Sequence, residues 1–498
     1  MKTKKYIILL IIILTAVFTG CSFNSGKVQW EEKDQLVFGT TLSIGSLDPA
    51  NGYSGWYLVR YGIGETLFRL DDDMEAVSWL ADGYERTGEN QWKIAIKDNI
   101  TFQNGKKMTP QEVKKSLDRV IKLNKRAAIT LKVTDIQAGE DYIILKTSEE
   151  NPTLIRDLCD PFAAIIDVEN ENQDTSPIGT GPFIIREFNS KNTTTLIKNE
   201  NYWDGEVKLA SVKVMTVKDS DTLSMALQSG EIDIAQGLSY SMVNLFRGDE
   251  SYKVDTVDTS RAIVLYFNQS NGILQDPSVR SAINMAINKE EYCKIILRGE
   301  ATPATGAFPD DELETVKYDL EKAKEIIEAS GYTAGDLKLQ LVTYSQRREL
   351  TTIAECLQSD LKAIGVEASI EISDNIDELV SYGDFDLCLY SNITSSTGDP
   401  GVYISNAMAT DGAANYGGYS NEKADELISI MNQEFDSDIR KALGDEIQQI
   451  VLNDNGYGFI GHMRMSFVMK NNVTGISPHP TDYYQFTANT DIGQVTNE

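Results

Sequence analysis

Apolar and polar residues follow distinct spacings along the chain, and the clearest pattern covers residues 337–390. Every second residue is apolar over 337–341, which is typical of a strand, and a stripe at helical spacing then runs over 353–364. Alternation returns at 366–372, and 385–390 has the composition of a further strand. The pattern predicts a β-α-β-α-β unit, and hence a parallel sheet with right-handed crossovers.

Three amphipathic helices have recognisable N-terminal signals. Thr109 to Glu112 form a capping box with Pro at the first helical position. Asp276-Pro277 begins a second helix, and a third covers 318–330, with Asp319 as its cap and Gly331 after its end. Their apolar faces predict packing against a core and need no functional explanation.

The N-terminus has the pattern of a signal peptide, with three lysines before an apolar run over 6–18. This run is about 13 residues long, short of the ~20 that a spanning helix needs. The following Thr19-Gly20-Cys21 resembles a lipobox, although Phe18 stands where leucine is usual. We expect a signal peptide over 1–20 and a lipidated Cys21 on a flexible tether over 21–35, anchored in the membrane through its acyl chains.

Length and charge narrow the choice of class. The chain has 498 residues, too many for one core, which favours two or three domains. Its net charge is -29, from 46 Lys+Arg and 75 Asp+Glu. Such a surface repels phosphate backbones, so nucleic acid is not an expected partner.

Cysteines and histidines give no catalytic or metal-binding constellation. Cys159, Cys293, Cys356 and Cys388 form no CxxC pair, and we interpret them as small buried apolar residues, with a disulfide left open. His462 and His479 are too isolated for an all-protein metal site. A secreted hydrolase is the competing class, but HExxH and GxSxG are both missing from the sequence. We therefore expect no enzyme, no cofactor and no metal.

Several segments, in order, resemble one known family. The chain is similar over nearly all of its mature length to the oligopeptide, dipeptide and nickel-binding proteins (family 5) that serve bacterial ABC importers as extracytoplasmic solute-binding subunits. The matching segments are Leu47-Asp48-Pro49, Glu65 to Leu70, Ile100 to Gly105, Met108 to Val113, Gly179 to Phe183, Asn201 to Gly205, Ala226 to Asp233 and Asp276 to Ile283.

The resemblance implies an α/β fold of the two-lobed periplasmic-binding-protein type (type II), with an extra subdomain and a ligand cleft between the lobes. Lobe I is expected over 36–70, 182–262 and, on the return of the chain, 480–498. The family-specific insert is expected over 71–181 and lobe II over 263–479. The resemblance also implies a permease and an ATPase as partners, and no Walker-type GxxxxGK[ST] occurs in this chain.

Two charged loops follow strands of the predicted parallel sheet, where ligands of such sheets bind. Arg347 and Arg348 follow the first strand and precede a helix, whose N-terminus favours a carboxylate. Asp399 follows the last strand and is placed to receive an ammonium group. In dipeptide-binding relatives an Arg and an Asp in these regions hold the termini of the peptide. The alternatives are that Arg347 and Arg348 are solvated surface residues and that Asp399 only caps a turn.

Aromatic residues complete the expected ligand site. Tyr53, Trp56 and Tyr57 follow Leu47-Asp48-Pro49, where relatives line the cleft from lobe I, and Tyr416 lies in a Gly-rich loop. Ordinary packing explains each of them as well.

Short peptides are the expected ligands, with a nickel chelate as the alternative. Nickel-binding relatives hold a metal that is already chelated, through Arg and aromatic contacts, so two histidines do not exclude this ligand. Asp160 stands before Pro161-Phe162, where an Arg clamp would be sought, and this weakens the nickel interpretation. A peptide sensor is a third possibility that the sequence leaves open.

Overall fold

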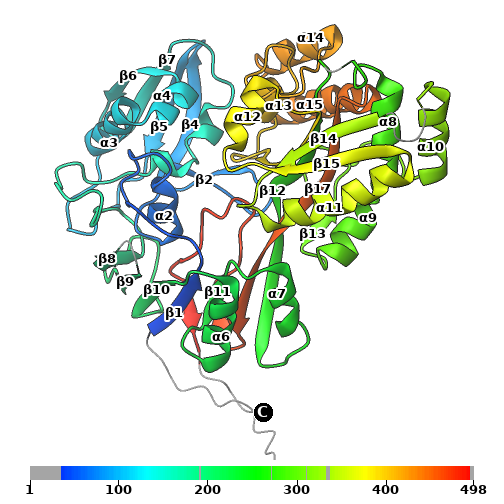
Figure 1. Cartoon of the computed structure of the whole chain (residues 1–498). Coiled ribbons are helices and arrows are strands. Elements are labelled where there is room, and N and C mark those ends of the chain that lie inside the picture. Colours follow the sequence, from blue (N-terminus) through cyan, green and yellow to red (C-terminus); the bar gives the residue numbers. More distant parts are fainter. Residues whose placement is uncertain (1–34, 190–191, 271, 310, 333–336, 494–498) are drawn as a thin grey trace, which may run out of the picture.

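The computed structural model (Figure 1) describes residues 35–493 apart from 190–191, 271, 310 and 333–336. The expected signal peptide and Cys21, with nearly all of the tether, lie outside the described residues. Within the described part, none of the helices combines the length and the apolar character needed to cross a membrane.

One mixed sheet runs through both lobes and has eleven strands in the described part of the chain. Lobe II contributes one end, lobe I the other, and two long strands lie between them (Figure 1). The order is β15 (Val366–Ile372), β14 (Leu337–Thr343), β16 (Leu387–Ile393), β12 (Tyr252–Phe267), β17 (Tyr457–Lys470), β11 (Ile234–Gln236), β1 (Gln35–Thr40), β10 (Ser211–Thr216), β9 (Thr193–Lys198) and β8 (Phe183–Asn189), with β13 (Ala301–Pro303) also on β17.

Lobe II confirms the predicted β-α-β-α-β unit. Strand β14 leads through α11 (Arg348–Ala363) to β15 and through α12 (Ile376–Tyr382) to β16, and β14 is parallel to both neighbours. Both faces of this sheet are covered by helices, which is why its strands are so apolar. One face packs against α8 (Pro277–Ala286), α10 (Leu320–Ala329) and α11, and the other against α13 (Gly401–Ala407), α14 (Glu422–Met431) and α15 (Ser437–Asn453). The short α9 (Lys289–Glu291) and a π-turn over 292–296 follow α8 in the sequence.

The three predicted helix starts are confirmed. The Thr109 side chain accepts the backbone N–H of Glu112 at the start of α3 (Pro110–Leu123). Asp276 and Asp319 cap α8 and α10 in the same way. Each cap satisfies a backbone donor that the helix cannot pair internally.

Lobe I is built around β1, which is parallel to β10 and β11. Helices α2 (Gly55–Arg60), α6 (Ser220–Ser229) and α7 (Tyr240–Phe246) belong to this lobe, as do the short strands β18 (Val473–Thr474) and β19 (Asp491–Ile492). The chain returns to lobe I earlier than residue 480, because Phe467 and Met469 lie in the lobe I core, where the end of β17 pairs with β11.

Strands β12 and β17 pass continuously from one lobe to the other. They are antiparallel, and their register shifts between Asp258 and Ala262. A bulge of this kind bends a strand pair and increases its twist. The two lobes therefore meet at an irregular segment of the sheet.

The segment 71–181, expected to be the insert, has a sheet of its own, with the strand order β4 (Ala81–Gly88), β5 (Gln91–Ile96), β7 (Tyr142–Thr147) and β6 (Val133–Ala138) in the described part. Helices α3, α4 (Lys125–Leu131) and α5 (Leu154–Asp157) belong to it, and α3 and α4 supply buried residues to the same core. A hairpin of β2 (Phe68–Leu70) and β3 (Ala76–Ser78) connects lobe I with the insert.

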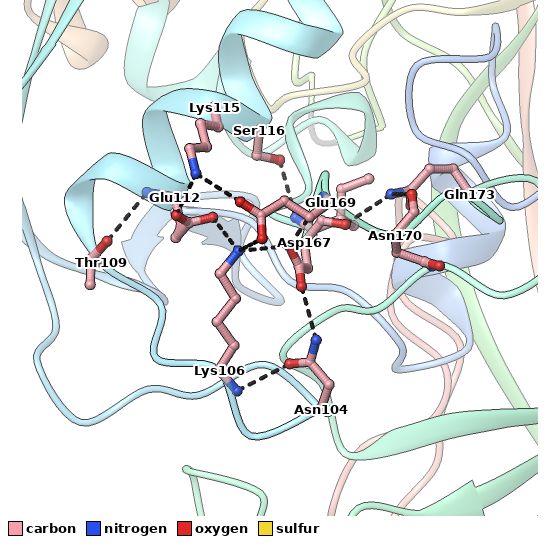
Figure 2. Close-up of polar contacts among 11 residues, drawn as sticks. Asn104, Lys106, Thr109, Glu112, Lys115, Ser116, Asp167, Glu169, Asn170 and Gln173 are labelled. Atoms are coloured by element: carbon pink, nitrogen blue, oxygen red, sulfur yellow. Dashed lines mark hydrogen bonds and ion pairs between the residues drawn. The ribbon is translucent and has the colours of Figure 1, made fainter.

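An ion network joins the start of α3 to residues 167–169, near the end of the insert (Figure 2). The Lys106 ammonium lies 2.8 Å from Glu112, 2.9 Å from Asp167 and 3.0 Å from Glu169, and Lys115 binds Glu112 and Glu169 as well. Because every charge has a partner, the network ties α3 to the loop that leads back to lobe I and offers no free ligand site.

Candidate ligand cleft

A cleft of about 670 Å³ lies between the two lobes. It is lined from lobe I by α2, the loop before α6, the end of β11 and the C-terminal loop over 480–483. Lobe II contributes residues 346–349, and the middle parts of β12 and β17 form its floor. This volume is typical of a small-molecule site.

The cleft is cationic in an otherwise acidic protein. Of the residues that line it, six are basic and four are acidic, whereas the whole chain carries -29. The basic residues are Arg60, Lys218, Arg261, Arg347, Arg348 and Arg464, and the acidic ones are Asp219, Glu300, Glu349 and Asp482. Such a concentration of one sign attracts ligands of the opposite sign.

Two of these arginines are already engaged. Arg60 forms an ion pair with Asp482, whose carboxylate also accepts from Gln236 and Gln485 at 2.9 Å. Burial raises the pKa of Asp482, and the Arg60 charge acts against this. Arg464 lies 2.7 Å from Asp258. These pairs shape the wall of the cleft and leave little charge for a ligand.

Arg261 has no such partner. Within the described residues, no carboxylate lies within the 4.0 Å of an ion pair from Arg261, Arg347 or Arg348. Burial, together with the neighbouring Arg347 charge, lowers the pKa of Arg261 to about 10, although the Glu349 and Asp482 carboxylates act in the opposite direction. Its contact with the Ser391 hydroxyl is long, at 3.4 Å. A partly buried guanidinium next to a second one is a ready site for a carboxylate.

The structure brings four of the expected residues into this cleft: Arg347, Arg348, Trp56 and Tyr57. Arg347 is the N-cap residue of α11, and Arg348 begins that helix, so both lie at the end of β14 as expected. Trp56 and Tyr57 approach from α2 on lobe I. Residues from both lobes thus face the same space.

The three other expected residues lie outside the cleft. Asp399 is buried, and the Arg440 guanidinium holds both of its oxygens at 2.6 and 2.7 Å. Tyr53 is 59% exposed and packs on Trp56 and Arg126. Tyr416 packs in an aromatic cluster with Tyr266 and Tyr390 in lobe II. Asp399 is therefore not free to receive an ammonium group.

Arg261 was not predicted from the sequence as a residue of the ligand site, although one feature of the sequence pointed to it. It is the only charged residue of the segment Arg261 to Phe267, which is otherwise apolar or aromatic. A lone arginine in such a strand is expected to have a specific partner. Its position beside Arg347 depends on the pairing of β12 with β16, which no local pattern reveals.

The two histidines and the described cysteines are packed within the fold and form no ligand site. His479 contacts Thr481 and the Asp71 carbonyl, and burial lowers the pKa of His462 to about 4. Cys159, Cys293 and Cys388 are buried, Cys356 is partly buried, and all four are free thiols. No group of His, Cys, Asp and Glu among the described residues is arranged to hold a metal.

Comparison with known proteins agrees with this architecture. Residues 75–415 match the bacterial extracellular solute-binding proteins, family 5. The chain belongs to this family. It is therefore the solute-binding subunit of an ABC importer, from a family that works outside the cytoplasm and is not enzymatic.

Several individual proteins are similar over almost their whole length. The nickel-binding protein NikA of Staphylococcus aureus is 29% identical over 99% of this chain and 100% of its own. Its structure with Ni(L-His)2 has a TM-score of 0.76 and covers 92% of this chain and 99% of that one. A nickel ABC transporter structure from Bacillus halodurans, also 29% identical, has a TM-score of 0.83 over 92% and 100%. The glutathione-binding protein GsiB of Pectobacterium atrosepticum is 24% identical over 92% and 94%.

Proposed function

We propose that this protein captures a small ligand that presents carboxylate groups and delivers it to its permease, and that a nickel chelate of an amino acid is the first candidate. Arg261, partly buried and without a carboxylate partner, carries this proposal together with Arg347. The similarity to the nickel-binding proteins of Staphylococcus aureus and Bacillus halodurans supports the choice of ligand.

Short peptides are the second candidate. The volume of the cleft admits them, and the similar GsiB is a glutathione-binding protein. Two observations support our ranking of peptides below a chelate. Asp399 is engaged by Arg440, and the acidic residues of the cleft are outnumbered by basic ones, so a carboxylate finds a partner more readily than an ammonium group does.

The proposal is tested by titrating the full-length chain and its Arg261→Gln variant with Ni²⁺ plus L-histidine, with each component alone, and with short peptides. Removing one partner of a desolvated charge pair costs about 2–5 kcal/mol, so affinity should fall about 30- to 4000-fold. Arg186→Gln is the control, because Arg186 is exposed on lobe I away from the cleft. If Arg261→Gln binds a ligand as tightly as the wild type does, the proposed role of Arg261 is contradicted.

We also propose that Cys21 carries a lipid that holds the protein at the outer face of the membrane. The signal pattern that ends in Thr19-Gly20-Cys21 supports this assignment. Radiolabelled fatty acid should enter the wild type and not Cys21→Ala. Equal labelling of both would refute it.

A further inference from the structure

Among the described residues, two contacts join lobe II to the insert outside the ligand cleft. At the first place, the Arg156 guanidinium of the insert donates to the Met74 carbonyl at 2.6 Å and to the Thr397 carbonyl of lobe II at 3.4 Å. Neither Arg156 nor Thr397 lines the cleft. One side chain thus joins the two parts of the molecule.

Gly398, next to Thr397, allows this contact. Its φ is +76°, a conformation that L side chains rarely adopt. A Cβ atom here would lie 2.2 Å from the Met74 carbonyl oxygen and 2.6 Å from Arg156 Nη1. Any side chain at this position would push lobe II away from the insert.

Phe435, in the turn between α14 and α15, makes the second contact. The Arg86 guanidinium lies 3.8 Å from the centre of its ring, and the Trp92 ring lies 6.5 Å away. Arg86 and Trp92 belong to β4 and β5, and Phe435 packs against the core of the insert. An aromatic ring of lobe II therefore lies on the sheet of the insert.

Arg440 holds both contact segments of lobe II in place. This residue of α15 is 3% exposed, and it binds the Asp399 carboxylate beside Gly398. The same guanidinium donates to the carbonyls of Met431 and Glu434, just before Phe435. Asp399 also accepts the Gly401 N–H at 2.7 Å, which fixes its loop. The Asp399–Arg440 pair thus aligns the two surfaces that meet the insert.

We propose that the insert is a latch for the closed conformation: lobe II, when it closes on ligand, docks on the insert through Gly398 and Phe435. A contact stabilises the conformation that contains it, so these contacts favour the arrangement of lobe II and the insert seen here, whatever the ligand is. The latch rests on the proposed function only in assuming that ligand is captured by closure. It assigns Asp399 and Arg440 the role of positioning residues.

The test measures closure without any ligand. Spin labels are attached at Ile129→Cys on the insert and Ile295→Cys on lobe II, which are 74% and 68% exposed. Cys21→Ser and Cys356→Ser keep other accessible thiols unlabelled in the full chain. Pulsed electron resonance then gives the distribution of distances between the two parts. The variants are Gly398→Ala and Phe435→Ala, with Gly383→Ala as the control.

Gly383 is a matched control, because it also has a positive φ (+70°) and lies in lobe II, but a Cβ there meets nothing within 4 Å. We expect Gly398→Ala and Phe435→Ala to lengthen the distance and Gly383→Ala to leave it unchanged. Phe435→Ala covers the case in which Gly398→Ala fails to fold, as judged by circular dichroism. Distributions equal to wild type in both variants would overturn the latch. Failure of Ni²⁺ plus L-histidine to bind would count only against the proposed function.

Discussion

Single residues show how a buried charge is either paired or kept for a ligand. Arg440 and Asp399 are both almost fully buried and satisfy each other. Arg261 is partly buried beside Arg347, and burial and this neighbour both lower its pKa. In the first arrangement each charge offsets the cost of burying the other, so the loss of either partner would destabilise the fold. The second stores a charge whose natural complement is a carboxylate brought by the ligand.

Asp157 is a buried acid whose pKa predicts a pH effect on stability. Burial, together with the Asp399 and Asp160 charges, raises this pKa to about 7, while the hydrogen bond from the Thr153 hydroxyl acts in the opposite direction. Arg440 and Arg126 hold those two carboxylates, so neither arginine is free to pair with Asp157. Between about pH 4 and 7 the folded chain keeps a proton that the unfolded chain has released. The free energy of unfolding therefore falls as pH rises through this window.

Asp157→Asn should remove this dependence, because the amide keeps the Thr153 contact and does not titrate. Chemical denaturation at about pH 5 and about pH 8 measures it. The loss of unfolding free energy between the two pH values should be smaller in the variant, by roughly 1.4 kcal/mol for each pH unit between about 5 and the raised pKa of about 7. The pKa of Asp311 is also raised to about 7. Asp311 is present in both proteins, so its contribution to the pH dependence cancels in the comparison. Parallel pH profiles would show that Asp157 is ionised throughout.

At the scale of elements, local patterns predicted what local physics decides. The caps at Thr109, Asp276 and Asp319 and the β-α-β-α-β unit follow from hydrogen bonding and spacing within a few residues, and the structure confirms them. The position of Arg347 at the end of β14 followed from the same reasoning.

Long-range pairing decided the rest. Strand β12 pairs with β16 and β17, which both follow it far along the chain, and this places Arg261 in the cleft. The partner of Asp399 is Arg440, on a helix that begins 38 residues later, at Ser437. Neither pairing has a local signal, so the sequence alone assigned Asp399 to the ligand and left Arg261 unassigned.

At the scale of the whole molecule, an acidic surface surrounds a cationic cleft. The net charge of -29 keeps the protein soluble, whereas the six basic residues of the cleft draw an anionic group toward the gap between the lobes. In our proposal, closure about β12 and β17 then brings lobe II onto the ligand and onto the insert. The charge of the cleft and the unpaired Arg261 both favour the proposed ligand that presents carboxylates.

Native mass spectrometry of the full-length protein, isolated from cells without added ligand, tests this claim most directly. We expect a bound small molecule with at least one carboxylate group, retained by the wild type and by Arg186→Gln but lost from Arg261→Gln. A metal in the adduct would favour the chelate, and a metal-free peptide the second candidate. A bound molecule without any carboxylate, or one that Arg261→Gln retains fully, would contradict the account.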